Sequence, residues 1–425
     1  MKLLLALRGA AKASTLCQRR ALSSFREQAV RAVASKLRTD LESNPNLWLS
    51  AAAVDEPTVS ILDPAQGYAI VNGVHTHLHG GLEKLVAESV TIKYLQTDKS
   101  ALMDPFELVR DDMVTVTESI KNILGSDHPV LSAVAKYFFE HDGGKKAAEA
   151  HRAAMGLPLP EHQSVEFTQA AQQRLAQIAE MIHTASLLHD DVIDEADTRR
   201  GVPSVNKVFG AKLAILAGDY MLARSSMSLA RLRSLEAVEL MSTVIEHLVK
   251  GEVMQMKNAD GRDDITPFEY YLRKNYYKTG SLMANSCKAA LALGKHDAHV
   301  SDMGFAYGRH IGLAFQLIDD VLDYQGHQSG KPLLADLKSG LATAPLLLAQ
   351  EEFPVLRELA ARKFSQPGDI DLASELVEKS TGIARSRELA IGQAELACQA
   401  AMQYAPSPAR DALVRLAQLV VYRSK

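Results

Sequence analysis

The sequence predicts an all-α protein built as one large helical bundle, and three observations carry this prediction. From Asp104 onward, apolar residues recur at intervals of three and four, as Leu175, Ile178 and Ile182 do, which is the spacing of one helix face. No stretch shows the sustained alternation of a half-buried strand. No unit of about 30–45 residues repeats, which argues against a solenoid. With 425 residues, 47% of them hydrophobic, the chain can bury a large core.

The expected helices follow one another along the chain. One of them ends in the stretch HTASLLHDD, where Ala185 and His189 continue the apolar stripe. Further helical windows cover residues 211–232, 235–258, 268–292, 301–324 and 340–352, and two more follow Asp369. Turn-forming sequences separate them at Gly210, Gly261, GKHD (294–297) and GHQSGKP (326–332).

The region before Asp104 has a different character. Residues 1–26 are basic and serine-containing, with no acid before Glu27, which is typical of a transit peptide and indicates import to the matrix side of the mitochondrion. A plastid address and a disordered basic tail are the alternatives. Residues 27–103 mix turn formers with short apolar runs and are expected to form an irregular N-terminal extension. The helical domain is assigned to residues 104–425.

Composition excludes several classes of protein. A net charge of −4 gives no basic field for nucleic acid. Three scattered cysteines exclude a disulfide scaffold and a cysteine zinc site. No apolar run approaches the roughly 20 residues of a membrane span. The alternating His75, His77 and His79 have no cysteine or carboxylate partner nearby, so we interpret them as part of a solvated loop and not as a metal site.

Two acid clusters stand at the ends of apolar helical segments. The first is Asp190, Asp191 and Asp194, and the second, with the same spacing, is Asp319, Asp320 and Asp323. Acids one helical turn apart repel each other by a few tenths of a kcal/mol, which a bound cation would relieve. Oxygen ligands without cysteine or histidine favour Mg²⁺, with water and a phosphate completing the octahedron. A solvated acidic face is the alternative, and the repetition of the pattern argues against it.

Basic residues accompany these clusters. Arg199 and Arg200 directly follow the first one, where a diphosphate bridged to Mg²⁺ would need positive charge. Lys278 precedes Thr279 in YYKTGSL, and Lys338 lies in ADLKSGLATAP. Each of these lysines, taken alone, would more often be solvated than a ligand.

In combination and order, these motifs resemble the trans-prenyl diphosphate synthases, and most of all the mitochondrial long-chain type that makes the solanesyl or decaprenyl tail of ubiquinone. The resemblance covers Asp104 to Lys425 and is carried by HTASLLHDDVIDEADTRRG, AGDYMLARSS, YYKTGSLMANSCKAA, GLAFQLIDDVLDYQG and GKPLLADLKSGLATAPLLLA. It implies the isoprenoid synthase fold, an all-α bundle with a central active-site cavity. It also implies a prenyltransferase that condenses isopentenyl diphosphate successively onto an allylic diphosphate.

The resemblance implies roles for individual residues. The expected Mg²⁺ ligands are Asp190, Asp194, Asp319 and Asp323. The positions expected to bind the allylic diphosphate are Arg199, Lys278, Thr279, Gln316 and Lys338. The positions expected to bind isopentenyl diphosphate are Lys145, His183 and Arg200. The residues expected to act directly on the departing diphosphate are Asp190, Asp194, Arg199, Lys278 and Asp319. The family also implies a homodimer or a heteromer with a related subunit, and membrane association through the long product.

The sequence departs from the family where isopentenyl diphosphate should bind. The family opens its second long helix with Gly-Lys-x-x-Arg-Pro, whereas GGKKAAEAHRAAMGLPLP supplies Lys145 but has Ala148 and Glu149 in place of arginine and proline. Arg152 lies on nearly the same helix face as Lys145 and is a partial substitute. A real deletion and an incorrect gene model would both explain the pattern. A smaller departure is Gln255, where short-chain relatives carry an acid.

Three functions are therefore compared. The first is an active long-chain synthase, the second a non-catalytic or impaired subunit of a heteromeric synthase, and the third a class I terpene cyclase. The intact second acid cluster argues against the second and third. The small Ala185 and Ser186, about 6–7.5 Å below Asp190 along the helix, stand where short-chain relatives place aromatic rings, and they predict a long product. Close helix packing is the alternative reason for small residues there.

Overall fold

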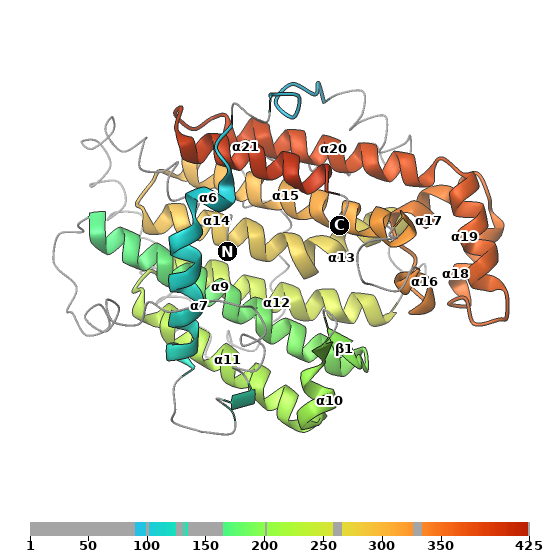
Figure 1. Ribbon diagram of the computed structural model, residues 1–425, viewed down its shortest axis with the longest axis horizontal. Helices are drawn as coiled ribbons and strands as arrows, with labels where there is room; N and C mark the ends of the chain where they lie inside the picture. The colour runs from blue at the N-terminus through green and yellow to red at the C-terminus, as the bar shows by residue number, and fades with distance from the viewer. Residues whose placement is uncertain are drawn as a thin grey trace, which may run out of the picture.

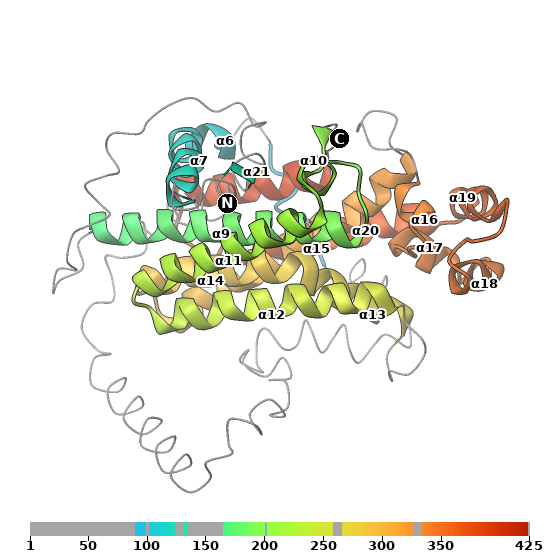
Figure 2. The same ribbon diagram turned by 90° about the horizontal axis from the view of Figure 1, so that it is seen from below.

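The computed structural model of the chain is a bundle of helices with one short hairpin (Figures 1 and 2). The structure describes residues 90–98, 102–124, 131, 133–134, 165–199, 202–257, 266–325 and 334–423. The expected transit peptide, the three alternating histidines, Lys145, Arg152 and Arg200 lie outside these residues.

Helices make up most of the described chain. In chain order they are α6 (Pro105–Leu108), α7 (Arg110–Ile123), α9 (Val165–Ile193), α10 (Val205–Phe209), α11 (Ala211–Arg231), α12 (Leu235–Lys257), α13 (Pro267–Asn275), the π-helix η4 (Tyr276–Gly280), α14 (Ser281–Leu293), α15 (Ala298–Gln325), α16 (Ala335–Lys338), α17 (Ala344–Ala349), α18 (Val355–Ala361), α19 (Asp369–Lys379), α20 (Gly382–Ala401) and α21 (Pro408–Val421). Strands β1 (Thr198–Arg199) and β2 (Val202–Pro203) pair antiparallel, with Thr198 opposite Pro203. Within the described residues, the predicted all-α class is confirmed.

Several helix boundaries differ from the prediction. The window 268–292 is two helices, α13 and α14, joined by η4. The window 340–352 contains only α17, and α18 was not predicted. Three helices, not two, begin at or after Asp369, because Ser380 is extended (φ −84°, ψ 174°) and ends α19 before α20 begins. The sequence carries a signal for this break, because residues 378–382 (EKSTG) contain no apolar side chain.

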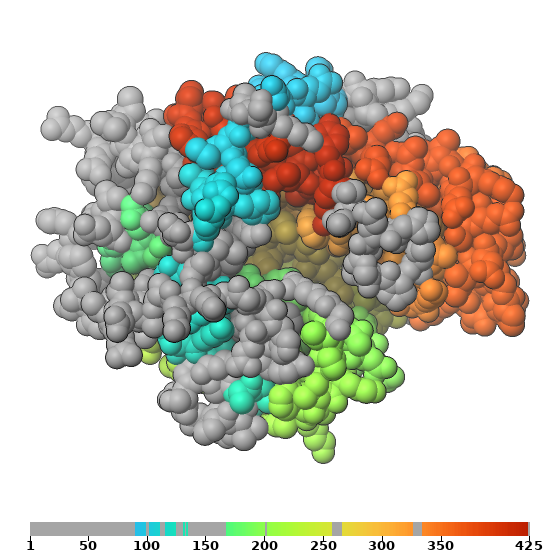
Figure 3. Space-filling view, viewed as in Figure 1, coloured from blue at the N-terminus to red at the C-terminus, as the bar shows by residue number. Residues whose placement is uncertain are grey.

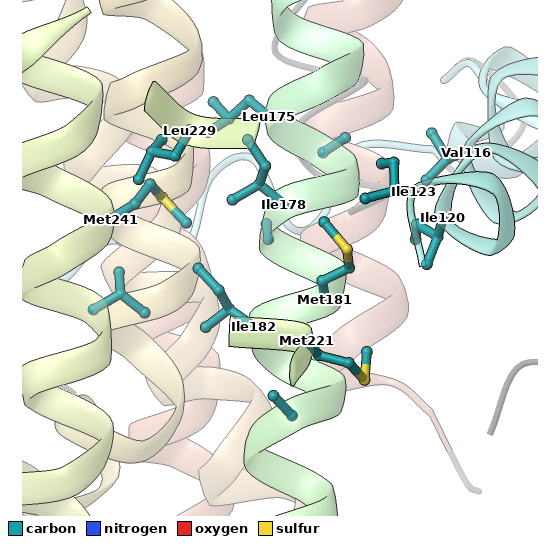
Figure 4. Close-up of a cluster of buried hydrophobic side chains, with 14 of the residues drawn as sticks. Val116, Ile120, Ile123, Leu175, Ile178, Met181, Ile182, Met221, Leu229 and Met241 are labelled. Carbon is teal, nitrogen blue, oxygen red and sulfur yellow. The ribbon is translucent and has the colours of Figure 1, made fainter. Parts of the chain in front are cut away.

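The first core cluster surrounds α9. Ile178 and Ile182 point from α9 towards α12, where Met241 lies, while Met181 points towards α7 (Figure 4). These side chains are almost completely buried. The turns of α9 before the acid cluster therefore pack in one core with residues of α11, α12 and α14.

The second core cluster joins α14, α15, α17, α20 and α21. It includes Leu95, which lies in the region expected to form the N-terminal extension. The buried carboxylate of Glu395 on α20 accepts hydrogen bonds from the backbone N–H groups of Tyr94 and Leu95, at 3.1 Å each. Gln418 on α21 donates to the carbonyl oxygens of Leu95 and Thr97. These contacts attach residues 90–98 to the bundle, and the domain boundary at Asp104 stays a prediction.

Helices α13 and α21 begin with side-chain N-caps. At α13 the Thr266 side chain accepts from the Glu269 N–H and the Glu269 carboxylate accepts from the Thr266 N–H, a capping box that starts the helix at Pro267. At α21 the Ser407 hydroxyl accepts from the Arg410 N–H at 3.2 Å. These caps matter for the site because α13 and the end of α21 both contribute side chains to it.

The two long helices that carry the acid clusters end on the same side of the bundle. In both views the hairpin that follows α9 and the α16 segment that follows α15 lie to the right of the centre (Figures 1 and 2). The space-filling view shows a hollow on this face, between the red α21 and the light-green segment around α10 (Figure 3). The fold therefore brings the neighbourhoods of both clusters to the same half of the molecule.

Candidate active site

The first acid cluster closes α9. Asp190 is half-buried in the last turn, and Asp194 is exposed just beyond Ile193. Burial raises the pKa of Asp190 to about 7; Lys278 opposes this rise, and Glu252 and Asp194 add to it. Acids at a helix C-terminus also face the negative end of the helix dipole. The end of α9 is therefore a place where negative charge is crowded and a cation would be stabilised.

The middle acid of this cluster has a different partner. Asp191 is buried, and the Arg199 Nε lies 2.9 Å from each of its carboxylate oxygens, while the Arg199 Nη2 lies 2.7 Å from Oδ1. The Asn206 amide donates to the carbonyl oxygens of Asp191 and Ala196, which fixes the turn between α9 and the hairpin. Asp191 thus orients Arg199, whose positive charge also acts on Asp194. This explains why the cluster has three acids although only two were expected to bind metal.

The π-helix η4 places Lys278 and Thr279 between the two clusters. The Lys278 Nζ forms an ion pair with Glu252 on α12 and donates to the Gln255 Oε1 at 2.9 Å. A Cβ added at Gly251 would lie 2.6 Å from the Lys278 Cγ, so α12 approaches η4 closely only because residue 251 is glycine. The Thr279 hydroxyl turns the other way and donates to the Gln316 Oε1 on α15 at 3.3 Å. In the wider turn of the π-helix, the adjacent Lys278 and Thr279 therefore contact different helices, α12 and α15.

The three acids of the second cluster have different partners. Asp319 forms an ion pair with Arg423, which follows α21. The guanidinium of Arg423 also donates to the Phe315 carbonyl at 3.0 Å and lies 3.9 Å above the Phe315 ring. Asp323 accepts from the N–H groups at the start of α16, those of Ala335 (3.1 Å) and Asp336 (3.2 Å). Asp319 thus faces a cation, and Asp323 anchors α16.

Asp320 is buried and does not face the open side of the cluster. Its carboxylate accepts from the Tyr271 hydroxyl at 2.6 Å, from the Gln316 Nε2 at 3.1 Å and from the Ala344 N–H at 3.3 Å. Burial raises the pKa of Asp320 to about 6, and the hydrogen bonds from Tyr271 and Gln316 oppose this rise. The middle acid of the second cluster is therefore internal, like Asp191 in the first.

The carboxylates suit a metal ion that takes only some of its ligands from the protein. Among the described residues, no group of three or more histidine, cysteine, aspartate or glutamate side chains is close enough to hold a metal by itself. The crowded charge around Asp190 and the pairing of Asp319 with a guanidinium both indicate sites that favour positive charge. Oxygen donors with few protein ligands per ion fit Mg²⁺, which keeps water and phosphate in its coordination shell.

The other expected residues are distributed around this frame. His183 is half-buried on α9, two turns before Asp190, and Lys338 is exposed at the end of α16. Ala185 is completely buried in the first core cluster, whereas Ser186 is half-buried and donates to the His183 carbonyl at 2.8 Å. Sequence reasoning missed Glu252, Tyr271 and Arg423. Each lies far along the chain from the acid that it contacts, so no local motif could have indicated it.

A helical bundle in which two acid clusters flank a lysine and an arginine defines an enzyme that acts on diphosphate esters with the help of a divalent ion. The family model for polyprenyl synthetase matches residues 128–377. The chain therefore belongs to the polyprenyl synthetase family and is a prenyltransferase.

Relatives agree with this assignment. The chain is 42% identical to solanesyl-diphosphate synthase 1, mitochondrial, of Oryza sativa subsp. japonica over 347 residues, which cover 76% of this chain and 79% of the relative. It is 42% identical to the human all-trans-polyprenyl-diphosphate synthase over 326 residues, covering 76% of this chain and 78% of that one. A polyprenyl synthase from Caulobacter crescentus, solved with calcium and isoprenyl diphosphate, superposes with a TM-score of 0.63 at 29% identity, covering 79% of this chain and 99% of that chain. The isoprenoid synthase fold expected from the sequence is thereby confirmed.

Proposed function

We propose that the chain is a long-chain trans-prenyl diphosphate synthase. It extends an allylic diphosphate with successive isopentenyl diphosphate units, uses Mg²⁺, and makes the side chain of ubiquinone. The observation that supports this most strongly is the frame built by Asp190, Lys278, Thr279 and Asp319, in which η4 lies between two carboxylate clusters. The names of the rice and human relatives support the long-chain product.

The chain's own residues can promote departure of the diphosphate. Bound Mg²⁺ supplies positive charge to the diphosphate. Asp190 and Asp194 would hold the ion at the end of α9, and Asp319 and Asp323 would do so at the end of α15. Lys278, together with Arg199 oriented by Asp191, adds fixed positive charge where negative charge develops as the bond to the allylic carbon breaks.

The second half of the reaction joins the two substrates. The double bond of isopentenyl diphosphate attacks the allylic carbon, a new carbon–carbon bond forms, and the departed diphosphate takes the proton that the product loses. Isopentenyl diphosphate would be held by Lys145, His183 and Arg200. Of these, the structure describes His183, which lies on α9 between the first cluster and the apolar part of the helix.

Incubation of the purified full chain with Mg²⁺, farnesyl or geranylgeranyl diphosphate and labelled isopentenyl diphosphate tests this proposal. Label should enter a long polyprenyl diphosphate, and chelation of the metal should stop the incorporation. No extension by this chain alone, but extension after a related subunit is added, would replace the proposal with that of an impaired subunit. A cyclic hydrocarbon formed without isopentenyl diphosphate would replace it with a terpene cyclase.

The expected product lies in the solanesyl-to-decaprenyl range. No aromatic ring occupies the two positions below Asp190, where Ala185 and Ser186 lie, and apolar side chains of α9 continue beneath them (Figure 4). Ser186 is on the same side of α9 as Asp190, because four residues make about one helical turn. The complete burial of Ala185 also fits the alternative of close helix packing, so product analysis of substituted chains has to decide.

The chain is also proposed to form a homodimer or a heteromer with a related subunit. Apolar side chains are exposed along the outer faces of α11 and α12, among them Ile215, Leu216, Val249, Val253 and Met256. On α12 these residues are spaced by four and three, so they form one stripe that a partner helix could cover. Light scattering of the purified chain at several concentrations would measure the assembly.

The proposed location is the matrix side of the mitochondrion, with peripheral membrane association through the product. The rice relative carries the word mitochondrial in its name, and residues 1–26 have the composition of a transit peptide. No helix within the described part of the chain is both long and apolar enough to cross a membrane. Import assays with and without residues 1–26, followed by carbonate extraction, would test both statements.

A further inference from the structure

The residue before Asp190 is anchored on the neighbouring helix α11. The His189 Nε2 lies 3.2 Å from the Ile215 carbonyl oxygen and 3.5 Å from the Asp219 Oδ1. A carbonyl oxygen only accepts hydrogen bonds, so Nε2 carries the hydrogen, and it does so whether the ring is neutral or charged. The Asp219 side chain is 59% exposed, and an exposed contact of this length contributes little. The hydrogen bond to Ile215 is therefore the one that orients the ring.

Helix α11 leaves room for this ring at Gly218. Gly218 is buried, and a Cβ added there would lie 2.2 Å from the His189 Nε2 and 2.6 Å from its Cδ2. Real Cβ atoms do not come this close to other side-chain atoms, so an alanine at this position would displace the ring. The imidazole therefore lies directly against the backbone of α11, and the lack of a side chain at residue 218 makes this contact possible.

Both residues that flank Asp190 are held by other elements. Successive residues of a helix are about 100° apart around its axis, so His189 and Asp191 point to opposite sides of Asp190. His189 is held by α11, and Asp191 is held by the hairpin of β1 and β2. Asp190 itself points between them, where Lys278 and Glu252 act on its pKa.

Two anchors on opposite sides fix the rotation of the last turn of α9. Side-chain tips lie about 5–6 Å from a helix axis, so a rotation of about 20° would move the Asp190 carboxylate by about 2 Å. A misplacement of about 1 Å can lower the rate of an enzyme about a hundredfold. The contact between His189 and α11 is therefore close enough to the metal site to affect turnover.

We propose that His189 is a positioning residue for the metal ligand Asp190. Its ring packs on Gly218 and donates to the Ile215 carbonyl, and so holds the last turn of α9 with the Asp190 carboxylate towards the ion. The inference rests on the proposed function. The sequence pattern placed His189 in the apolar stripe of α9, whereas the structure gives it a hydrogen bond to a helix 26 residues further along the chain.

The chain offers variants that separate positioning from packing. In His189→Gln the amide nitrogen can take the place of Nε2 and donate to the Ile215 carbonyl, whereas the shorter side chain of His189→Asn cannot reach it. The matched control is the pair of Gly294 and His296, in which a Cβ on the glycine would lie 2.8 Å from the His296 Cδ2. This pair lies between α14 and α15, at the opposite end of α15 from Asp319. A purely structural role predicts the same outcome for both pairs.

Kinetics of the full chain with Mg²⁺ give the first test. We expect His189→Asn and Gly218→Ala each to lower kcat about ten- to a hundredfold, as the loss of a residue that orients a metal ligand does. The double variant should lose no more than either single variant, because both changes release the same turn. His189→Gln should recover most of the activity, and His296→Asn and Gly294→Ala should keep it. A double variant more active than Gly218→Ala would show only a relieved clash and overturn the inference.

Metal binding gives a second test that needs no turnover. The Mn²⁺ complex of inorganic diphosphate is titrated calorimetrically into each chain, and urea unfolding followed by circular dichroism measures stability in parallel. His189→Asn should weaken binding of this complex about tenfold, whereas His296→Asn should leave its affinity unchanged whatever its loss of stability. Equal affinities of His189→Asn and the unsubstituted chain would refute the role of His189 alone. Failure of the unsubstituted chain to bind the complex would instead refute the proposed function, and the role of His189 with it.

Discussion

The charge of Asp190 should lower the free energy of unfolding of the metal-free protein. Burial and neighbouring carboxylates destabilise the ionised side chain, and no bound cation offsets this. Its pKa rises from the ordinary 3.8 to about 7, so the folded chain binds this proton more tightly than the unfolded chain. Stability therefore falls as the pH rises from about 4 to about 7 and stays low above that window. About three pKa units at 1.36 kcal/mol each set an upper limit of about 4 kcal/mol.

Asp190→Asn removes the charge and keeps the size of the side chain. At pH 8 with a chelator present, we expect this chain to unfold with a free energy about 2–4 kcal/mol larger than that of the unsubstituted chain. The difference should shrink towards pH 4, because the aspartate then carries its proton. Turnover should fall by orders of magnitude, since a metal ligand is lost.

Urea unfolding followed by circular dichroism between pH 4 and pH 8 would measure both effects. The control is Asp371→Asn, because Asp371 is exposed in the first turn of α19 and its removal should change stability by less than about 1 kcal/mol. If Asp190→Asn is no more stable than the unsubstituted chain at pH 8, or if its stability has the same pH dependence, the argument from buried charge is wrong.

Arg423→Ala removes the guanidinium that pairs with Asp319 and leaves this carboxylate free to bind a metal ion. Mn²⁺ should then bind about fivefold more tightly, because a partly exposed ion pair contributes about 1 kcal/mol. Weaker binding in a calorimetric titration would contradict this. Ala185→Phe should shorten the product by several isoprene units while the first condensation stays fast, and Ser186→Phe is its comparison on the Asp190 side; unchanged chain length by mass spectrometry would place the shaft elsewhere. Restoring the family's arginine and proline after Lys145 should lower the KM for isopentenyl diphosphate about ten- to a hundredfold. Steady-state kinetics that give an already low KM for the present chain would contradict this.

Features that depend only on neighbours along the chain could be predicted from the residues alone. The helical class follows from the apolar period, and Asp190 lies one turn before Asp194 in any helix. The same holds for Asp319 and Asp323. The motifs around these acids were sufficient to indicate the family, which the comparisons confirmed. Periodicity could not locate the π-helix η4, which lies inside one predicted helical window.

The partner of each acid follows from the packing of the helices and could not be predicted from the sequence. Asp191 and Asp320 occupy the same position in two similar motifs, yet one holds an arginine in a hairpin and the other a tyrosine from α13. Arg423 reaches Asp319 across 104 residues of sequence. The local period states which side of a helix a residue is on, but not which helix lies opposite. That choice depends on how the apolar faces of all the helices pack together, a property of the whole chain.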